Sequence, residues 1–207
     1  MSQDRKSHWE GVYESKQFTD VSWYQQLPAR SLELIDAAAA GEDAPIIDIG
    51  GGASTLVDHL IARGYRDVTV LDISENALAQ ARSRLAGGSD RVHWIVSDVA
   101  AFRPERSYQV WHDRAVLHFL VDAADRRQYL AALRSALAPG GDLVLETFGP
   151  DGPLKCSGLE VRRYSVETMA ELLGAEFELK SDDIELHRTP SGGQQQFLCT
   201  RWRRQAQ

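Results

Sequence analysis

Short apolar runs alternate with amphipathic stretches from Ala44 to about Leu145, and this alternation restricts the fold more than any other feature of the 207-residue chain. The pattern predicts βαβ units around a parallel sheet with helices on both faces. The predicted strands are residues 46–49, 67–72, 92–96, 108–112 and 142–148. The predicted helices between them have Ser74 and Asp122 as N-caps, and one of them stops before Pro139. The length suits one α/β domain.

The pattern changes after Gly149, where a loop is expected. Ser165 is then predicted to cap a short helix that continues through Leu173. The last predicted elements are two antiparallel strands, roughly residues 177–187 and 195–202, joined by a hairpin turn at residues 189–193.

The first predicted strand runs into Asp48-Ile49-Gly50-Gly51-Gly52. Glycine lets the backbone pass close to a nucleotide, and an acid about 20 residues later can accept hydrogen bonds from ribose hydroxyls, as Asp72 would here. Thr55 replaces the third glycine of a dinucleotide fingerprint, and Asp48 would repel a pyrophosphate but suits a cationic amino-acid end. The turn therefore favours S-adenosylmethionine over NAD. A tight strand–helix connection without a ligand is the alternative.

Asp98 follows the third predicted strand, much as Asp48 and Asp72 end the first and second. The carboxyl ends of parallel strands meet at one edge of the sheet, so these acids predict a shared ligand site. Asp98 would accept a hydrogen bond from the adenine amine while Val99 packs on the ring. A turn or N-cap aspartate is the alternative for Asp98.

Four segments, in order, resemble the class I S-adenosylmethionine-dependent methyltransferases: residues 46–52, 70–74, 97–99 and 137–141. The resemblance covers residues 46–148 and implies an α/β, Rossmann-like fold. That fold has a seven-stranded, mostly parallel sheet with helices on both faces and an antiparallel C-terminal hairpin strand. The resemblance also implies these cofactor-binding residues: Asp48, Gly50, Gly51 and Gly52 at the methionyl end, Asp72 with Ile73 at the ribose, and Asp98 with Ser97 and Val99 at the adenine. S-adenosylhomocysteine would be the product.

The N-terminal residues 8–13 and 21–25 resemble those of a methyltransferase subgroup. The subgroup includes uncharacterised bacterial enzymes and eukaryotic lysine methyltransferases that act on citrate synthase and elongation factor. In it this segment lies over the cofactor, which implies cofactor contacts for Trp9, Tyr13 and Trp23. Trp9 and Tyr13 are four residues apart and share one helix face, and plain core packing is their alternative role.

We accordingly expect an N-terminal helical cap segment over residues 1–40, which covers the cofactor site. Residues 41–207 are expected to form the methyltransferase core, and the two parts together make a single domain.

Methyl transfer is an in-line displacement at a sulfonium carbon, which needs a positioned nucleophile, for some acceptors a base, and no metal. In this family the methyl group lies beside the end of the fourth strand. Here that region carries His118 and Asp113, which we predict as the catalytic groups, because imidazole titrates near neutral pH. A structural hydrogen bond is the alternative for His118. His112 is expected to be buried and satisfied, and Arg114 to pair with an acid.

The net charge of −7 disfavours non-specific binding to nucleic-acid phosphates. The chain lacks the Asp/Asn-Pro-Pro-Tyr motif of enzymes that methylate amide and base nitrogens, which disfavours such acceptors. No apolar run approaches the roughly 20 residues of a membrane span, and the first residues lack the apolar core of a signal peptide. We therefore expect a cytoplasmic protein without a membrane partner.

We expect a methyltransferase that acts on a small-molecule acceptor, because the chain has little beyond the core fold with which to hold a large partner. A protein lysine methyltransferase is one alternative, suggested by the N-terminal resemblance. A non-catalytic S-adenosylmethionine-binding module is another, and an NAD-dependent oxidoreductase is weakened by Thr55 and Asp48.

Overall fold

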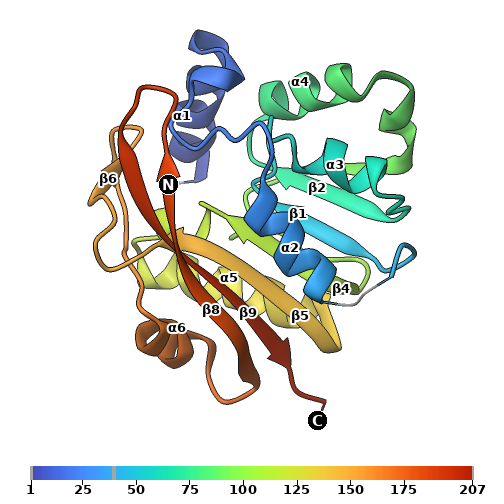
Figure 1. The fold of residues 1–207 in the computed structure, drawn as a ribbon, viewed down its shortest axis with the longest axis vertical. Helices are drawn as coiled ribbons and strands as arrows, with labels where there is room; N and C mark the ends of the chain where they lie inside the picture. Colours follow the sequence, from blue (N-terminus) through green and yellow to red (C-terminus); the bar gives the residue numbers. More distant parts are fainter. Residues whose placement is uncertain (1, 39–40, 207) are drawn as a thin grey trace.

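A seven-stranded sheet forms the centre of the protein, in a computed structural model that describes residues 2–38 and 41–206 (Figure 1). Its order is β3-β2-β1-β4-β5-β9-β8. The strands are β1 (Ile46–Ile49), β2 (Val68–Asp72), β3 (Val92–Val96), β4 (Tyr108–Arg114), β5 (Leu137–Phe148), β8 (Phe177–Arg188) and β9 (Gln194–Arg204). Strands β1 to β5 are parallel, and β9 runs antiparallel to β5 and β8. The predicted mostly parallel sheet with an antiparallel C-terminal hairpin is confirmed.

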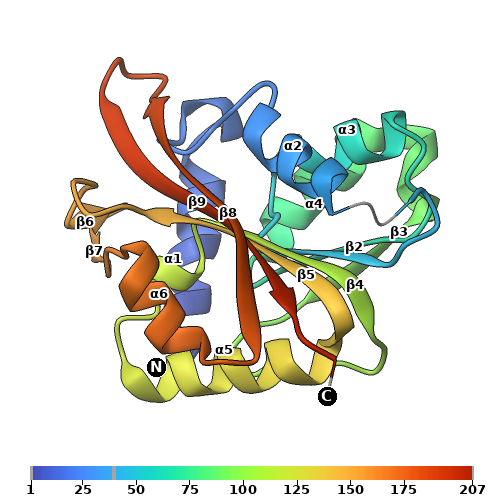
Figure 2. The ribbon, with the colours of Figure 1, turned by 60° about the horizontal axis from the view of Figure 1, so that its bottom comes forward.

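Helices cover both faces of this sheet (Figure 2). One face carries α2 (Ala29–Ala37), α3 (Leu56–Ala62) and α4 (Glu75–Leu85), and the other carries α5 (Ala123–Ala136) and α6 (Val166–Leu173). Leu32 and Leu60 belong to one buried cluster, whereas Tyr129 and Leu173 belong to another. The sheet is therefore buried on both faces, as parallel strands require.

Three predicted N-caps are present in the structure. The Oγ of Ser74 accepts a hydrogen bond from the Ala77 amide at 3.1 Å, and the Asp122 carboxylate accepts one from the Ala124 amide at 2.7 Å. Ser165 forms a capping box with Thr168 at the start of α6. Each cap satisfies backbone donors that the first helical turn leaves free, so these starts could be predicted from local sequence.

Strand β5 begins earlier than predicted. Residues 139–141 were expected to precede the strand, yet pairing already starts between Tyr108 and Leu137, then shifts register before Val110 pairs with Asp142. Gly140 has a φ of +76°, which lets the chain form this irregularity without ending the strand.

The N-terminal part consists of α1 (Ser2–Ser15), a short 3-10 helix η1 (Phe18–Asp20) and α2. The tip of the β8–β9 hairpin lies near this segment, where a ring nitrogen of His187 lies 2.8 Å from the Ser22 carbonyl (Figure 1). Helix α2 packs into the sheet core through Leu32 and Ile35. The expected division of the chain at residue 40 stays a prediction, and Ala39 and Ala40 lie outside the described residues.

The remaining small elements lie outside the main sheet. Two 3-10 helices, η2 (Ala86–Arg91) and η3 (Leu117–Phe119), precede β3 and α5, and a two-stranded hairpin, β6 (Lys155–Cys156) and β7 (Leu159–Glu160), occupies the predicted loop after β5. No helix in the described ranges is long and apolar enough to cross a membrane.

Candidate functional site

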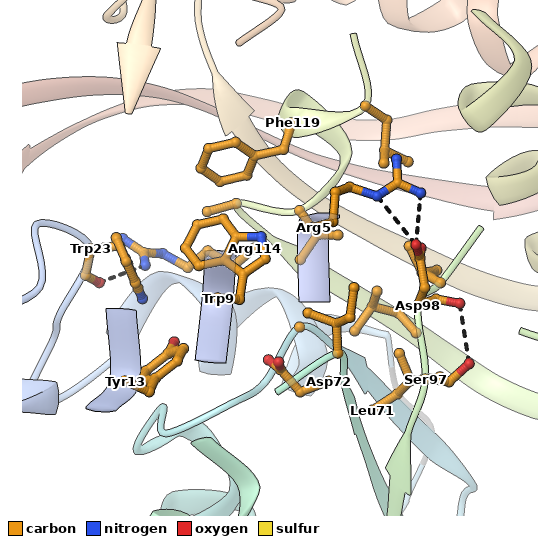
Figure 3. A pocket seen from close by; sticks show the side chains of 17 residues that line it. Arg5, Trp9, Tyr13, Trp23, Leu71, Asp72, Ser97, Asp98, Arg114 and Phe119 are labelled. Atoms are coloured by element: carbon orange, nitrogen blue, oxygen red, sulfur yellow. Dashed lines mark hydrogen bonds and ion pairs between the residues drawn. The ribbon is translucent and has the colours of Figure 1, made fainter. Parts of the chain in front are cut away.

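A cavity lies between α1 and the carboxyl ends of β1, β2 and β3 (Figure 3). It encloses about 710 Å³ of space, part of it open to solvent. Predicted cofactor residues on its wall are Trp9, Tyr13, Trp23, Gly50, Asp72, Ile73, Ser97, Asp98 and Val99. Residues from α1 and from three strand ends thus meet around one space.

A second cavity adjoins the first and shares Tyr13, Trp23, Gly50 and Arg114 with it. Its wall includes two further predicted residues, Asp48 and Gly51. It also includes Phe18, Val21, Tyr24, Gln25, Pro28, Ser31, Ala53, Ser54, Leu56 and His112. The methionyl residues of the prediction therefore lie mainly in this cavity, and the ribose and adenine residues lie in the first.

The glycine turn has the geometry that a close backbone approach requires. Gly50 has a φ of +66° and Gly52 a φ of +44°, a region that favours glycine. A Cβ on Gly50 would lie 2.0 Å from Cγ2 of Val116, and one on Gly52 would lie 2.8 Å from a carboxylate oxygen of Asp72. A side chain at either position would collide with groups that line the cavity. The turn therefore fits a ligand such as S-adenosylmethionine.

Asp72 ends β2 and is 6% exposed. Its Oδ1 accepts a hydrogen bond from the Ser74 amide at 2.8 Å. Burial raises the pKa of this carboxyl to about 7, and the negative charges of Asp48 and Glu10 add to the effect. Donated hydrogen bonds from ribose hydroxyls would favour the ionised carboxylate, so the group fits the predicted ribose contact.

Asp98 is a turn aspartate that also lies on the wall of the first cavity. Its Oδ1 accepts a hydrogen bond from the Ala100 amide at 2.9 Å. Its Oδ2 accepts hydrogen bonds from Arg5 at 2.7 and 3.2 Å (Figure 3). Arg5 also pairs with Asp125 at the start of α5. The Asp98 side of the first cavity is thereby linked to α1.

Glu10 provides a second link between α1 and the core. Its carboxylate accepts hydrogen bonds from the Ser74 hydroxyl at 2.7 Å, the Glu75 amide at 2.9 Å and the Asn76 amide at 3.2 Å. These donors form the N-terminus of α4, where a negative charge is favourable. Although partial burial opposes ionisation, these hydrogen bonds lower the pKa of Glu10.

Aromatic side chains form the wall of the first cavity nearest α1. The ring of Trp9 packs edge-on against Trp23 at 5.7 Å and against Phe119 at 5.0 Å between centroids. Tyr13 lies 6.4 Å from Trp23. The three predicted aromatic residues therefore pack together and also border the cavity, so packing and cofactor contact are compatible roles.

His118 and Asp113 are fully buried and line neither cavity. Nδ1 of His118 accepts a hydrogen bond from the Phe148 amide, and burial with the nearby Arg114 charge lowers the pKa of His118 to about 3. The carboxylate of Asp113 accepts hydrogen bonds from the Tyr129 hydroxyl at 2.8 Å and the Val116 amide at 2.9 Å. Both side chains hold the segment after β4 in place, and their predicted catalytic roles stay predictions.

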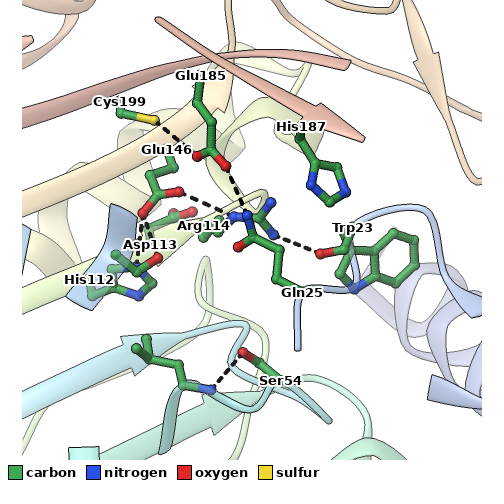
Figure 4. Close-up of polar contacts among 12 residues, drawn as sticks. Trp23, Gln25, Ser54, His112, Asp113, Arg114, Glu146, Glu185, His187 and Cys199 are labelled. Atoms are coloured by element: carbon green, nitrogen blue, oxygen red, sulfur yellow. Dashed lines mark hydrogen bonds and ion pairs between the residues drawn. The ribbon is translucent and has the colours of Figure 1, made fainter. Parts of the chain in front are cut away.

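Charged side chains form a buried cluster at the second cavity, whose wall includes Asp48, His112 and Arg114. Figure 4 shows the polar contacts of His112, Arg114 and Glu146. Nδ1 of His112 lies 2.7 Å from Oδ1 of Asp48, and its Nε2 lies 3.6 Å from Oε1 of Glu146. Burial disfavours the imidazolium, but the two carboxylates outweigh it and raise the pKa of His112 to about 9. Glu146 also accepts hydrogen bonds from the Ser31 hydroxyl at 2.5 Å and from Arg114 at 3.2 Å.

Glu146, Glu185 and Cys199 bring three potential metal-ligand atoms within 4.8 Å of one another. The Glu146 oxygens already accept hydrogen bonds from Ser31 and Arg114, and burial raises the pKa of the Cys199 thiol. The donor set is therefore occupied by protein donors and does not fit a metal ion.

Sequence reasoning missed Arg5, Glu10, Phe119 and Glu146. Arg5 and Glu10 act on residues 64 to 120 positions away, and no local pattern marks such contacts. Glu146 carried a weak signal, because an acid at the end of an apolar predicted strand needs a buried partner.

Comparison with known proteins gives a match to one family model and to several relatives. Residues 46–141 match the family model described as a methyltransferase domain. Nodulation protein S of Rhizobium tropici is 32% identical over 111 residues, which are 54% of this chain and 46% of that protein. The tRNA U34 carboxymethyltransferase of Actinobacillus pleuropneumoniae is 25% identical over 161 residues, which are 76% of this chain and 47% of that protein. This chain spans about half the length of these curated relatives.

A solved structure shares the whole fold. It is the 1,6-didemethyltoxoflavin-N1-methyltransferase of Burkholderia thailandensis, with bound 1,6-didemethyltoxoflavin and S-adenosylhomocysteine. The TM-score is 0.70 at 23% identity, and the match covers 99% of this chain and 87% of that one. The fold is that of the class I methyltransferases. The comparisons thus show a match to a methyltransferase domain over residues 46–141 and a shared methyltransferase fold over nearly the whole chain.

Proposed function

We propose that this protein is an S-adenosylmethionine-dependent methyltransferase that transfers a methyl group to a small-molecule acceptor. One observation carries the proposal: with the exception of Gly52, the residues predicted for the methionyl, ribose and adenine parts of the cofactor line two adjoining cavities, although they come from the N-terminal segment and three separate strand ends. The match of residues 46–141 to a methyltransferase domain supports it independently.

S-adenosylmethionine, when bound, supplies a methyl group on a sulfonium sulfur that is already a good leaving group. Asp72 would accept hydrogen bonds from the ribose hydroxyls, and Asp98 and Val99 would hold the adenine. The turn at Gly50 would let the backbone approach the methionyl end beside Asp48. These residues position the cofactor, and correct positioning is the main requirement of an in-line displacement.

Helix α1 acts in this proposal as a cap. Trp9, Trp23 and Phe119 form an apolar wall on the first cavity. His118 and Asp113, which lie behind the wall, act as positioning residues for the segment after β4. A nucleophile that reacts without losing a proton needs no base in contact with it.

A small acceptor is favoured by the setting of the site. The cavities lie under α1 and the N-terminal segment, and the net charge of −7 works against a polyanionic partner. The solved relative from Burkholderia thailandensis is itself named for methylation of a small heterocycle. Protein lysine methylation, implied by the likeness of the N-terminal segment to lysine methyltransferases, is the alternative to be tested.

The test has two parts. Calorimetry should show binding of S-adenosylhomocysteine, and Asp72→Ala should weaken it. Labelled S-adenosylmethionine is then offered with small phenols, amines and heterocycles, with citrate synthase and elongation factor, and with tRNA. Turnover on a small molecule supports the proposal, and turnover on the proteins alone favours a lysine methyltransferase. Binding without any turnover indicates a binding module, and absence of binding contradicts the proposal altogether.

A further inference from the structure

Arg114, the last residue of β4, occupies the boundary between the two cavities. It lines both of them, and its side chain is 11% exposed. Asp48, which belongs to the neighbouring strand β1, lines the second cavity. The guanidinium is therefore placed where a ligand that extends from one cavity into the other would pass.

The hydrogen bonds of this guanidinium are incomplete. Nε donates to Oε2 of Glu146 at 3.2 Å, and Nη1 donates to the Trp23 carbonyl at 2.9 Å (Figure 4). The cation also lies over the ring of Phe197 at 4.8 Å. Nη2 is buried and has no hydrogen-bond partner among the residues that the structure describes. A buried donor of this kind is normally paired, so a partner from outside the described chain is expected.

The neighbouring protein carboxylates are already engaged. Glu146 accepts from Arg114 itself and from Ser31, and Asp48 pairs with His112. Glu185, which faces this region from β8, accepts a hydrogen bond from Gln25 at 2.9 Å. Nη2 of Arg114 therefore has no carboxylate partner among the residues that the structure describes.

We propose that Nη2 of Arg114 donates a hydrogen bond to a carboxylate of a molecule bound at the junction of the two cavities. A carboxylate fits best because its charge strengthens the bond to a guanidinium, and the aromatic walls shield that bond from water. The inference rests on the proposed function and deepens it. Two bound molecules can supply the carboxylate: the methionyl end of the cofactor, or an acceptor that is itself a carboxylic acid.

The first source has a specific geometric argument. A methionyl end is a zwitterion, with an ammonium and a carboxylate on one carbon. The second cavity has Asp48, which also pairs with His112 through Oδ1, on its wall for the cation and Arg114 for the anion. The second source is an acceptor with a carboxylate that binds beside the methyl group. Arg114 would then favour this acceptor over analogues that lack the charge.

The experiment measures binding by calorimetry, so it does not depend on turnover. S-adenosylhomocysteine and 5′-methylthioadenosine, which lacks the amino-acid end, are titrated into the wild type, Arg114→Gln and Arg114→Lys. The lysine variant keeps a charge beside Glu146 in case the glutamine variant fails to fold. Arg30→Gln is the control, because Arg30 pairs with Glu33 and lines neither cavity. Benzoate and benzamide are then titrated into the same proteins saturated with S-adenosylhomocysteine.

If the cofactor supplies the carboxylate, both Arg114 variants should bind S-adenosylhomocysteine about 10- to 100-fold more weakly and bind 5′-methylthioadenosine like the wild type. If an acceptor supplies it, S-adenosylhomocysteine affinity is unchanged, and benzoate, but not benzamide, binds the wild-type complex and loses affinity in the variants. Equal affinities of wild type and variants for all four molecules overturn the inference while leaving the proposed function intact. A wild type that binds neither nucleoside overturns both.

Discussion

At the level of a single residue, the ribose contact proposed for Asp72 would connect cofactor binding to pH. Burial raises the pKa of its carboxyl to about 7, whereas ribose hydroxyls bind the ionised form best. Ligand binding should therefore release a proton, and the affinity for S-adenosylhomocysteine should rise between pH 6 and pH 8. Asp72→Asn should remove this rise and weaken binding at pH 8 by about 1–3 kcal/mol.

Calorimetry in buffers of different ionisation enthalpy measures both the affinity and the proton release of this reaction. The asparagine variant is a close match, because it keeps the size of the side chain and an acceptor for the Ser74 amide. A wild-type affinity that stays constant over this pH range would remove Asp72 from the cofactor site.

Substitution of Gly50 tests whether the turn requires a residue without a side chain. Its φ of +66° and the 2.0 Å approach of a Cβ to Val116 predict that Gly50→Ala lowers the free energy of unfolding by about 1–3 kcal/mol. Adding Val116→Ala to Gly50→Ala should restore the free energy of unfolding that is lost to the clash with Val116. The loss that comes from the positive φ of residue 50 should remain. Gly87→Ala is the matched control, because a Cβ there meets nothing within 4 Å. Urea denaturation gives the three values, and equal losses at positions 50 and 87 would contradict the packing described here.

At the level of elements, α1 is held on the core by charge. Glu10 caps the N-terminus of α4, and α1 brings Arg5, Trp9 and Tyr13 to the first cavity. Glu10→Ala should loosen α1 and weaken S-adenosylhomocysteine binding several-fold, since a lost cap costs about 1 kcal/mol. Hydrogen exchange of α1 should rise in the same variant.

Glu171→Ala on α6 is the control for this element, because Glu171 is exposed and lies outside both cavity walls. If Glu10→Ala retains the wild-type affinity and the wild-type hydrogen exchange of α1, helix α1 is held over the site by other contacts, such as those of Arg5.

For the whole molecule, the buried pair of His112 and Asp48 links stability to pH. The pKa of His112 is about 9 in the folded protein and about 6.5 in an unfolded chain. A raised pKa contributes stability that is complete below the unfolded value and is lost as pH rises through the folded value. The free energy of unfolding should therefore fall by about 2 kcal/mol between pH 7.5 and pH 9.

Denaturation at several pH values in this window checks the slope, and His112→Gln should flatten it. Asp72 and Asp113 ionise mostly below this window, since the pKa of Asp72 is about 7 and that of Asp113 about 6. Identical slopes in the wild type and the glutamine variant would mean that His112 is not a cation in the folded protein.

Local sequence was sufficient for the strands of the main sheet and their order, but not for the β6–β7 hairpin or the early start of β5. The caps at Ser74, Asp122 and Ser165 and the turn at Gly50 depend on neighbouring backbone groups, so their residue types identify them. Parallel strands must end at one edge of the sheet, and for that reason Asp48, Asp72 and Asp98 could be predicted to share a site.

The contacts between distant segments became visible only in the folded chain. Arg5 reaches Asp98 across 93 positions, and Arg114 meets Glu146 across 32, because the path of the backbone brings them together. The same path places His118 behind the cavity wall, although its sequence position beside the fourth strand predicted a place at the methyl group. Local hydrogen bonding and periodicity set the elements, whereas the packing of those elements sets which side chains face the cavities.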